Sequence, residues 1–189
     1  MFILSIKNGQ KFLLNLSLFF LLTIWLLNIN YDSINAEEIY ENIDLGIKFT
    51  IPEKFEVSES ELNKIILSPK NMVESIYYEI SIESLENNNG ETLEKWLKKY
   101  LKDNYKDKDN FRIDVGPSGE PTHSKFSNNQ YNAYSFNLLD RENHNYNEHN
   151  FVSVNDKIFH FSYSAPTDEG YMEYLPDYRD FKKSVEFLN

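Results

Sequence analysis

One short polar segment of the 189-residue chain gathers side chains that could ligate a metal ion. Within "DRENHNYNEHN" (140–150) the candidates are Asp140, Glu142, His144, Glu148 and His149. Imidazole and carboxylate groups together suit zinc, manganese or copper, although their spacing matches no standard zinc arrangement. Two interpretations stay open: a divalent-metal site that uses the His144/His149 loop, and a solvated hairpin loop.

Two other histidines are further candidate metal ligands, and calcium is a second ion to consider. His123 lies in another long loop and would complete a site only if the fold brought it near, whereas His160 alternates within an expected strand and fits a surface or core position. Oxygens in "SESE" (58–61) and at Asp156 suit calcium, but no EF-hand loop is present. The sequence requires no cofactor, and Ca, Mn or Zn are the divalent metals to test.

The motifs of common catalytic sites are missing from the sequence. There is no cysteine, no G-x-S-x-G nucleophile elbow and no glycine-rich phosphate loop between a strand and a helix. Carboxylates are so abundant in this acidic chain that no single pair is informative. We therefore predict a protein that is not an enzyme and has no catalytic residues, with an unrecognised envelope hydrolase as the third interpretation.

The charge distribution excludes polyanions as partners. The formal net charge is −11, and because residues 1–36 carry a net +1, the remainder is near −12. Nucleic acid and anionic lipid headgroups repel such a protein. Its one basic cluster lies on a predicted helix and comprises Lys95, Lys98, Lys99 and Lys102. This cluster is either a solvated helix face or a docking site for a protein partner.

The first 36 residues have the layout of a targeting segment. Lys7 and Lys11 precede the apolar run 12–27, and a polar stretch then ends at Ala36. The run is long for a signal peptide and short for a membrane span. We expect a signal peptide cleaved after Ala36, or an N-terminal membrane anchor over 12–29 as the only membrane contact. Either would place residues 37–189 outside the cytoplasm, in a periplasm, in a lumen or at the cell surface.

Residues 37–189 predict one domain in which strands, a helix, further strands and a last helix follow one another. An apolar stripe predicts a helix from Thr92 to Tyr105, and Pro176 would open the last helix. The predicted strands are 43–51, 64–68, 75–84, 111–116, 131–138, 150–154 and 157–165, the last two joined by an Asn155-Asp156 hairpin. This order favours an α+β fold with an antiparallel sheet.

Five short motifs then carry a family resemblance. They are "GIKFTIPEKF" (46–55), in which Phe55 stands where tryptophan is more usual, "TLEKW" (92–96), "YNAYSF" (131–136), "FSYSAP" (161–166) and "YLPDYRDFKKSVEF" (174–187). In this order, over residues 40–188, they resemble the PsbP-like family. The resemblance implies a central antiparallel sheet with helices packed on both faces, an α/β/α sandwich.

The same resemblance implies a kind of function. The family is named for an extrinsic subunit of the photosystem II oxygen-evolving complex, it includes bacterial envelope proteins and a Ran-binding nuclear-transport protein, and its members share no catalytic residues. It implies a non-enzymatic exported accessory or binding protein that docks on a membrane-associated complex through a protein partner. The alternative is an extracytoplasmic metal-binding protein that uses the His144/His149 loop.

Overall fold

The structure is a computed structural model that describes residues 37–71, 78–87, 89–105, 111–114, 120–142 and 144–188. The chain divides after Glu37, and the unit from Glu38 to Asn189 holds the strands and helices named below. The predicted signal or anchor segment lies outside the described residues. Among the helices that are described, none is long and apolar enough to cross a membrane.

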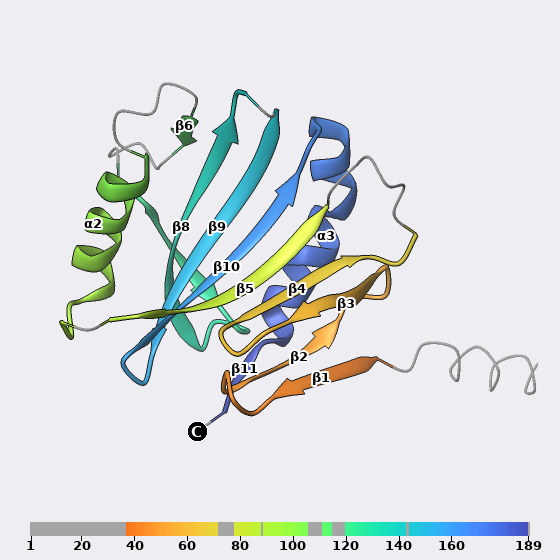
Figure 1. Ribbon diagram of the computed structural model, residues 1–189, viewed down its shortest axis with the longest axis horizontal. Coiled ribbons are helices and arrows are strands. Elements are labelled where there is room, and N and C mark those ends of the chain that lie inside the picture. Colours follow the sequence, from red (N-terminus) through yellow and green to blue (C-terminus); the bar gives the residue numbers. More distant parts are fainter. Residues whose placement is uncertain are drawn as a thin grey trace, which may run out of the picture. The chain divides into compact units, whose positions relative to one another are not determined.

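In the described part of the chain, eight strands form one antiparallel sheet (Figure 1). Their order is β3-β4-β5-β10-β9-β8-β6, and β7 also pairs with β8. Their bounds are β3 (Phe55–Ser60), β4 (Lys64–Pro69), β5 (Glu79–Glu86), β6 (Phe111–Asp114), β7 (Thr122–Phe126), β8 (Tyr131–Asp140), β9 (Asn145–Val154) and β10 (Lys157–Ala165). The pairing of β5 with β10 joins strands β3–β5 to strands β10, β9, β8 and β6.

A smaller antiparallel sheet has the order β1-β2-β11, with β1 (Glu38–Asn42), β2 (Ile47–Ile51) and β11 (Glu186–Phe187). The strand predicted over 43–51 is shorter than expected, because residues 43–46 form the turn between β1 and β2. Asn42 closes this turn by accepting a hydrogen bond from the Leu45 amide at 2.8 Å, and Gly46 has φ +78°. A glycine suits that left-handed position because it carries no Cβ.

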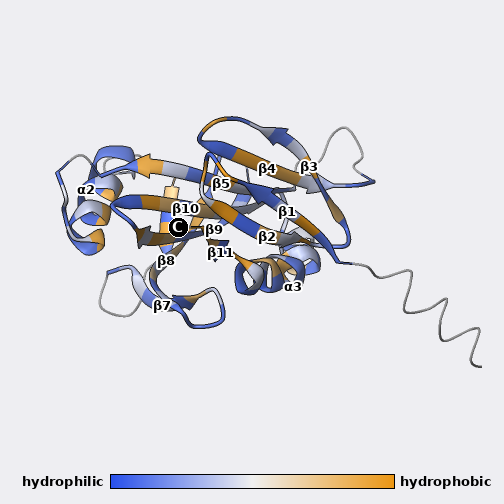
Figure 2. Ribbon diagram, turned by 90° about the horizontal axis from the view of Figure 1, so that it is seen from below, coloured by the Kyte–Doolittle hydropathy of each residue, from blue (hydrophilic) through white to orange (hydrophobic). Residues whose placement is uncertain are grey.

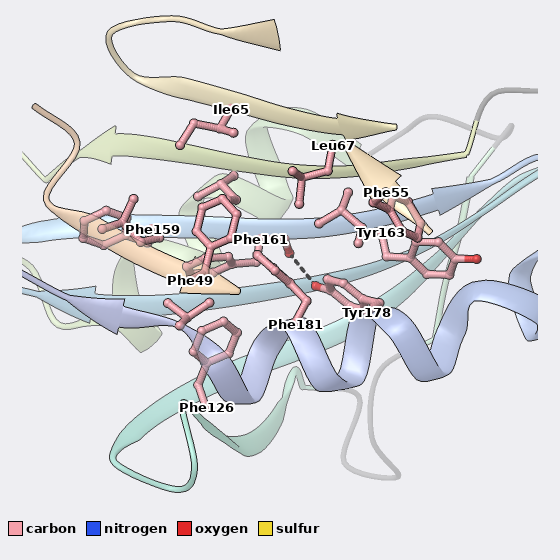
Figure 3. Packing of buried hydrophobic residues seen from close by; sticks show 14 of the residues in the cluster. Phe49, Phe55, Ile65, Leu67, Phe126, Phe159, Phe161, Tyr163, Tyr178 and Phe181 are labelled. Atoms are coloured by element: carbon pink, nitrogen blue, oxygen red, sulfur yellow. Dashed lines mark hydrogen bonds between the residues drawn. The ribbon is translucent and has the colours of Figure 1, made fainter. Parts of the chain in front are cut away.

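The larger core lies between the eight-stranded sheet, the small sheet and helix α3 (Asp168–Ser184). Tyr178 and Phe181 of α3 pack on Phe161 and Tyr163 of β10, and Phe181 meets Phe49 of β2 edge-on at 5.1 Å. Figure 3 shows these aromatic side chains converging from the strands and from the helix. Such burial of aromatic surface is the main source of stability for a domain of this size.

A second, smaller core forms under helix α2 (Leu93–Tyr105) on the opposite face of the large sheet. Leu97 and Trp96 pack on Phe136, Phe151 and Ile158. Ile158 belongs to this core although its neighbour Phe159 belongs to the larger one, because successive side chains of a strand point to opposite faces. Figure 2 shows the corresponding alternation of hydrophobic and hydrophilic residues along the strands.

The predicted α+β class, with helices sandwiching the sheet as α/β/α layers, is wrong. Of the described residues, 52% lie in strands and 22% in helices, so the fold is mostly β. Helix α2 has 13 residues, about 20 Å at 1.5 Å per residue, and the core beneath it draws on β5, β6, β8, β9 and β10. The other face is covered by α3 together with a second sheet, because β1 and β11 form strands that the sequence pattern did not predict.

The Tyr178 hydroxyl should be a measurable source of stability. It is fully buried, donates to the Phe161 carbonyl at 3.2 Å and accepts from the Asn150 amide at 3.0 Å, so it ties α3 to β10 and β9 (dashed line in Figure 3). Tyr178→Phe leaves both partners without this hydrogen bond, and we expect it to lower the free energy of unfolding by about 1–3 kcal/mol in urea titrations.

The matched control is Tyr131→Phe, because the Tyr131 ring packs edge-on against Phe187 at the margin of the same core. We expect this change to cost much less than Tyr178→Phe. An unchanged unfolding midpoint for Tyr178→Phe would contradict the role assigned to its hydroxyl.

Candidate functional site

Strands β5, β10 and β9 place three titratable side chains in a row beside helix α2. Glu83 lies opposite His160 in the β5–β10 register, and His149 is the diagonal neighbour of His160 across the β10–β9 pair. Nδ1 of His149 lies 2.8 Å from Nε2 of His160, and Nδ1 of His160 lies 3.9 Å from a carboxylate oxygen of Glu83. The strand register therefore forms a line of carboxylate, imidazole and imidazole.

Aromatic rings enclose this line. Phe151 stacks on His160 at 4.3 Å, Phe136 stacks on His149 at 4.8 Å, and Tyr100 of α2 lies 6.3 Å from His160. Both histidines are buried, each with 7% of its surface exposed. The pair sits within the smaller core, so α2 and its aromatic contacts shield it from solvent.

Burial decides the protonation of His149. Desolvation, assisted by the neighbouring His160, holds the pKa of His149 well below its usual range. Within the described residues its Nε2 is buried without a hydrogen-bond partner. On β5 the adjacent His160 lowers the pKa of Glu83 against the opposing effect of burial. The folded protein therefore keeps His149 neutral and Glu83 ionised at neutral pH.

The nearby hydroxyl groups are not aligned for nucleophilic chemistry. Ser162 lies opposite His149 in register, but its hydroxyl is 2.7 Å from that of Ser81 on β5. A Ser–His pair would need the serine hydroxyl within hydrogen-bond reach of an imidazole nitrogen. The two serine hydroxyls are therefore occupied with each other across β5 and β10.

The five residues of the predicted metal site are not brought together. Asp140 ends β8, Glu142 and His144 lie in the turn after it, and Glu148 and His149 lie in β9. Adjacent strand residues point to opposite faces, so His149 enters the α2 core while Glu148 meets Lys182 and Tyr171 of α3. The described residues contain no group of three His, Asp or Glu side chains that could hold a metal ion. Metal binding by these side chains stays a prediction that titration would test.

Glu148 has a packing partnership that the sequence pattern did not reveal. It forms an ion pair with Lys182 and accepts from the Asn150 amide at 3.1 Å, while the Tyr171 hydroxyl lies 3.5 Å away. Its side chain is 15% exposed and that of Lys182 is 19% exposed. These contacts fasten α3 to β9, and no local sequence signal predicts them because Glu148 and Lys182 are 34 residues apart.

The other two histidines lie on strands. The predicted long loop around His123 contains β7, where the exposed His123 packs on Tyr134 of β8 at 4.1 Å. His160 lies in β10, where the sequence predicted it as a surface or core histidine, and it is a core residue.

The four predicted docking lysines lie on α2, as expected from their spacing. Lys95 pairs with Glu91 at 2.7 Å, and Lys98 pairs with Glu94 at 3.0 Å and Glu120 at 3.4 Å. Lys102 is exposed in the last turn of the helix, whereas Lys99 faces a pocket beside Trp96. We call Lys95, Lys98 and Lys102 the lysine face.

Comparisons with known proteins identify the fold. No protein-family model and no curated protein matches the chain. The solution structure of cyanobacterial PsbP (CyanoP) from Synechocystis sp. PCC 6803 matches 81% of this chain and 94% of that chain, with a TM-score of 0.52 and 12% identity. A crystal structure from Bacteroides thetaiotaomicron VPI-5482 matches 81% of this chain with a TM-score of 0.53 and 9% identity. The chain spans about half of that protein, 49% of its length.

A third match is LpqN, involved in cell envelope biogenesis of Mycobacterium tuberculosis, with a TM-score of 0.49 and 10% identity over 82% of this chain and 87% of that chain. The match to cyanobacterial PsbP shows that the chain has a PsbP-like fold. The resemblance read from the five sequence motifs is thereby confirmed at the level of the fold.

The buried His149 should make stability depend on pH. An imidazole in the unfolded chain has a pKa of about 6.5, whereas burial lowers the pKa of His149 in the folded protein. Below about pH 6.5 the unfolded chain therefore binds a proton that the folded protein excludes. As the pH is lowered further, the free energy of unfolding falls by up to about 1.4 kcal/mol for each pH unit. Among the described residues, His160 contacts His149, and Glu83 and Tyr100 lie beside His160.

We expect His149→Phe, which keeps a ring against Phe136, to flatten the decline in the free energy of unfolding between pH 7 and pH 5. His123→Phe is the control, since His123 is exposed and should leave the slope unchanged. Urea titrations at each pH provide the measurement. Equal slopes for the wild-type protein and His149→Phe would show that His149 does not govern this dependence.

Proposed function

We propose that the chain is an exported, non-enzymatic accessory or binding protein that docks on a membrane-associated protein complex. The likeness to cyanobacterial PsbP carries this proposal, because it extends over 94% of that protein and 81% of this chain. The N-terminal layout of basic flank, apolar run and Ala36 supports export.

The surroundings of the histidines support a role without chemistry. A catalytic base must reach the proton that it abstracts, but His149 is enclosed by Phe136 and His160. Its Nε2 is buried and has no hydrogen-bond partner among the described residues. Ser81 and Ser162, the nearby hydroxyl groups, are hydrogen-bonded to each other.

The lysine face supports a place for the docking. Residues 37–189 carry a net charge near −12, and the lysine face concentrates positive charge on one helix of this domain. The Lys95 and Lys98 side chains are 72% and 50% exposed in their ion pairs with Glu91, Glu94 and Glu120. Exposed ion pairs of this kind are weak, so an acidic partner can replace the carboxylates of the chain itself.

Charge reversal on the lysine face should weaken docking. Lys98→Glu with Lys102→Glu places carboxylates where the partner would meet lysines, and we expect recovery of the partner to fall on the order of tenfold at low salt. The difference should shrink as salt screens the charges. In-cell cross-linking of the tagged full chain, followed by quantification of co-purified membrane proteins, measures this, and the melting temperature should change by less than about 2 °C.

The matched control is Lys70→Glu with Lys157→Glu, which makes the same change in charge at exposed positions outside α2. An equal loss of partner with this control would assign the effect to net charge and not to the lysine face. Full recovery of the partner with both double variants would refute docking through α2.

A further inference from the structure

A polar pocket of about 230 Å³ lies between helix α2 and the loop that connects β5 to it. From α2 it is lined by Trp96, Lys99, Tyr100, Asp103 and Asn104. From the end of β5 and the loop it is lined by Glu86, Asn87, Asn89 and Glu91. Helical spacing places Lys98 and Lys102 on another side of α2, whereas Lys95 of the lysine face adjoins the pocket through its ion pair with Glu91.

The pocket wall is held in place by hydrogen bonds across the loop. The Asn87 side-chain amide donates to the Glu91 carbonyl at 2.8 Å, and its side-chain oxygen accepts from the Glu91 amide at 3.0 Å. The Glu91 carboxylate pairs with Lys95 at 2.7 Å. This hydrogen-bonded pair, together with the charge of Lys99, keeps the pKa of Glu91 below its usual range. A wall formed before a ligand arrives reduces the entropic cost of binding.

The apolar part of the pocket is a pair of aromatic rings. Trp96 and Tyr100 stack at 5.1 Å with an angle of 14° between their planes. Phe151 supports both rings from the sheet, at 5.9 Å from Trp96 and 5.3 Å from Tyr100. The smaller core therefore fixes the orientation of this aromatic pair.

The lining combines hydrogen-bond donors and acceptors beside the aromatic pair. Asparagine amides offer both roles, carboxylates accept and the lysine donates, which matches hydroxyl groups that also donate and accept. Three carboxylates disfavour phosphate or another anion. The positive charges of Lys99, which is part of the lining, and of Lys95, which pairs with Glu91, offset most of the negative charge of those carboxylates. This balance favours a neutral ligand over a cation.

We propose that this pocket binds one ring of a neutral carbohydrate. The C–H side of the sugar ring would pack on Trp96 and Tyr100, and its hydroxyls would bond to Asp103, Asn89 and their neighbours. The volume lies below the roughly 300–1,000 Å³ of pockets for drug-sized ligands, so it accommodates one ring of a longer glycan.

The fluorescence of Trp96 allows a direct test in the full chain. The sequence has two tryptophans, so Trp25→Phe leaves Trp96 as the reporter. The protein, in a detergent without a sugar headgroup, is titrated with soluble oligosaccharides of glucose, N-acetylglucosamine, galactose and mannose, and separately with spermidine and inorganic phosphate. Saturation-transfer NMR provides a second readout. We expect at least one oligosaccharide to give saturable binding by both methods.

Variants connect the binding to the pocket. Asp103→Ala and Asn89→Ala, both at exposed positions, should each weaken binding by about fivefold to tenfold through the loss of a hydrogen bond. Asp44→Ala, at an exposed position in the β1–β2 turn, is the control and should bind as the parent does. The Lys98→Glu and Lys102→Glu double variant should also bind unchanged, so the sugar site and the docking face are tested separately.

Three outcomes would overturn the proposal. One is the absence of saturable binding for every oligosaccharide in both readouts. Another is unchanged affinity in Asp103→Ala and Asn89→Ala, which would place the sugar elsewhere. The third is tighter binding of spermidine or phosphate than of any sugar, which would make the pocket a site for ions.

Discussion

The structure depends on strand β10, which is buried on both faces. Antiparallel strands commonly leave one face to solvent. Strand β10 pairs with β5 and β9, and its side chains are buried on both faces of the sheet. Its buried residues are Ile158, Phe159, His160, Phe161, Tyr163 and Ala165. Each face of the sheet must therefore have a cover, and α3 with the small sheet supplies one while α2 supplies the other.

Elements defined by local chemistry were predictable from the sequence. The Asn155-Asp156 hairpin is present, and both residues have positive φ, 49° and 61°, as a two-residue turn requires. Helix α2 also begins and ends as its apolar stripe predicted, with the Thr92 hydroxyl 3.4 Å from the Lys95 amide at its start. In these cases the determining interactions lie within a few residues of each other.

Elements defined by distant partners were not predictable. The acidic stretch that contains β3 shows little alternation, because an edge strand is specified by its pairing with β4. The polar run before residue 150 looked like a loop, yet β9 begins at Asn145, where His149 contacts His160 of β10 and Glu148 pairs with Lys182 of α3. Helix α3 begins at Asp168 after the Thr167 cap, so Pro176 lies inside it and not in its first turn.

The residues of the candidate metal set lie apart in the structure for the same reason. A loop lets every side chain turn inward, but a strand sends consecutive residues to opposite faces. His149 and Glu148 are adjacent in sequence, but His149 contacts His160 on the α2 side of the sheet and Glu148 contacts Lys182 of α3 on the other side. Residue types alone indicated polar chemistry in this segment, whereas the pairing of β9 with β8 and β10 determined which groups meet.

The two covers of the sheet differ in what their surfaces can become. Helix α3 is held by Tyr178, Phe181 and the Lys182–Glu148 pair, so much of its surface is used for packing. Helix α2 rests on a smaller core, and its outer residues carry the lysine face and line the pocket. The matched structures share the fold at only 9–12% identity to this chain, so most residue identities differ between them. Because exposed positions tolerate substitution at little cost in stability, α2 is the element on which this fold can acquire a specific partner or ligand.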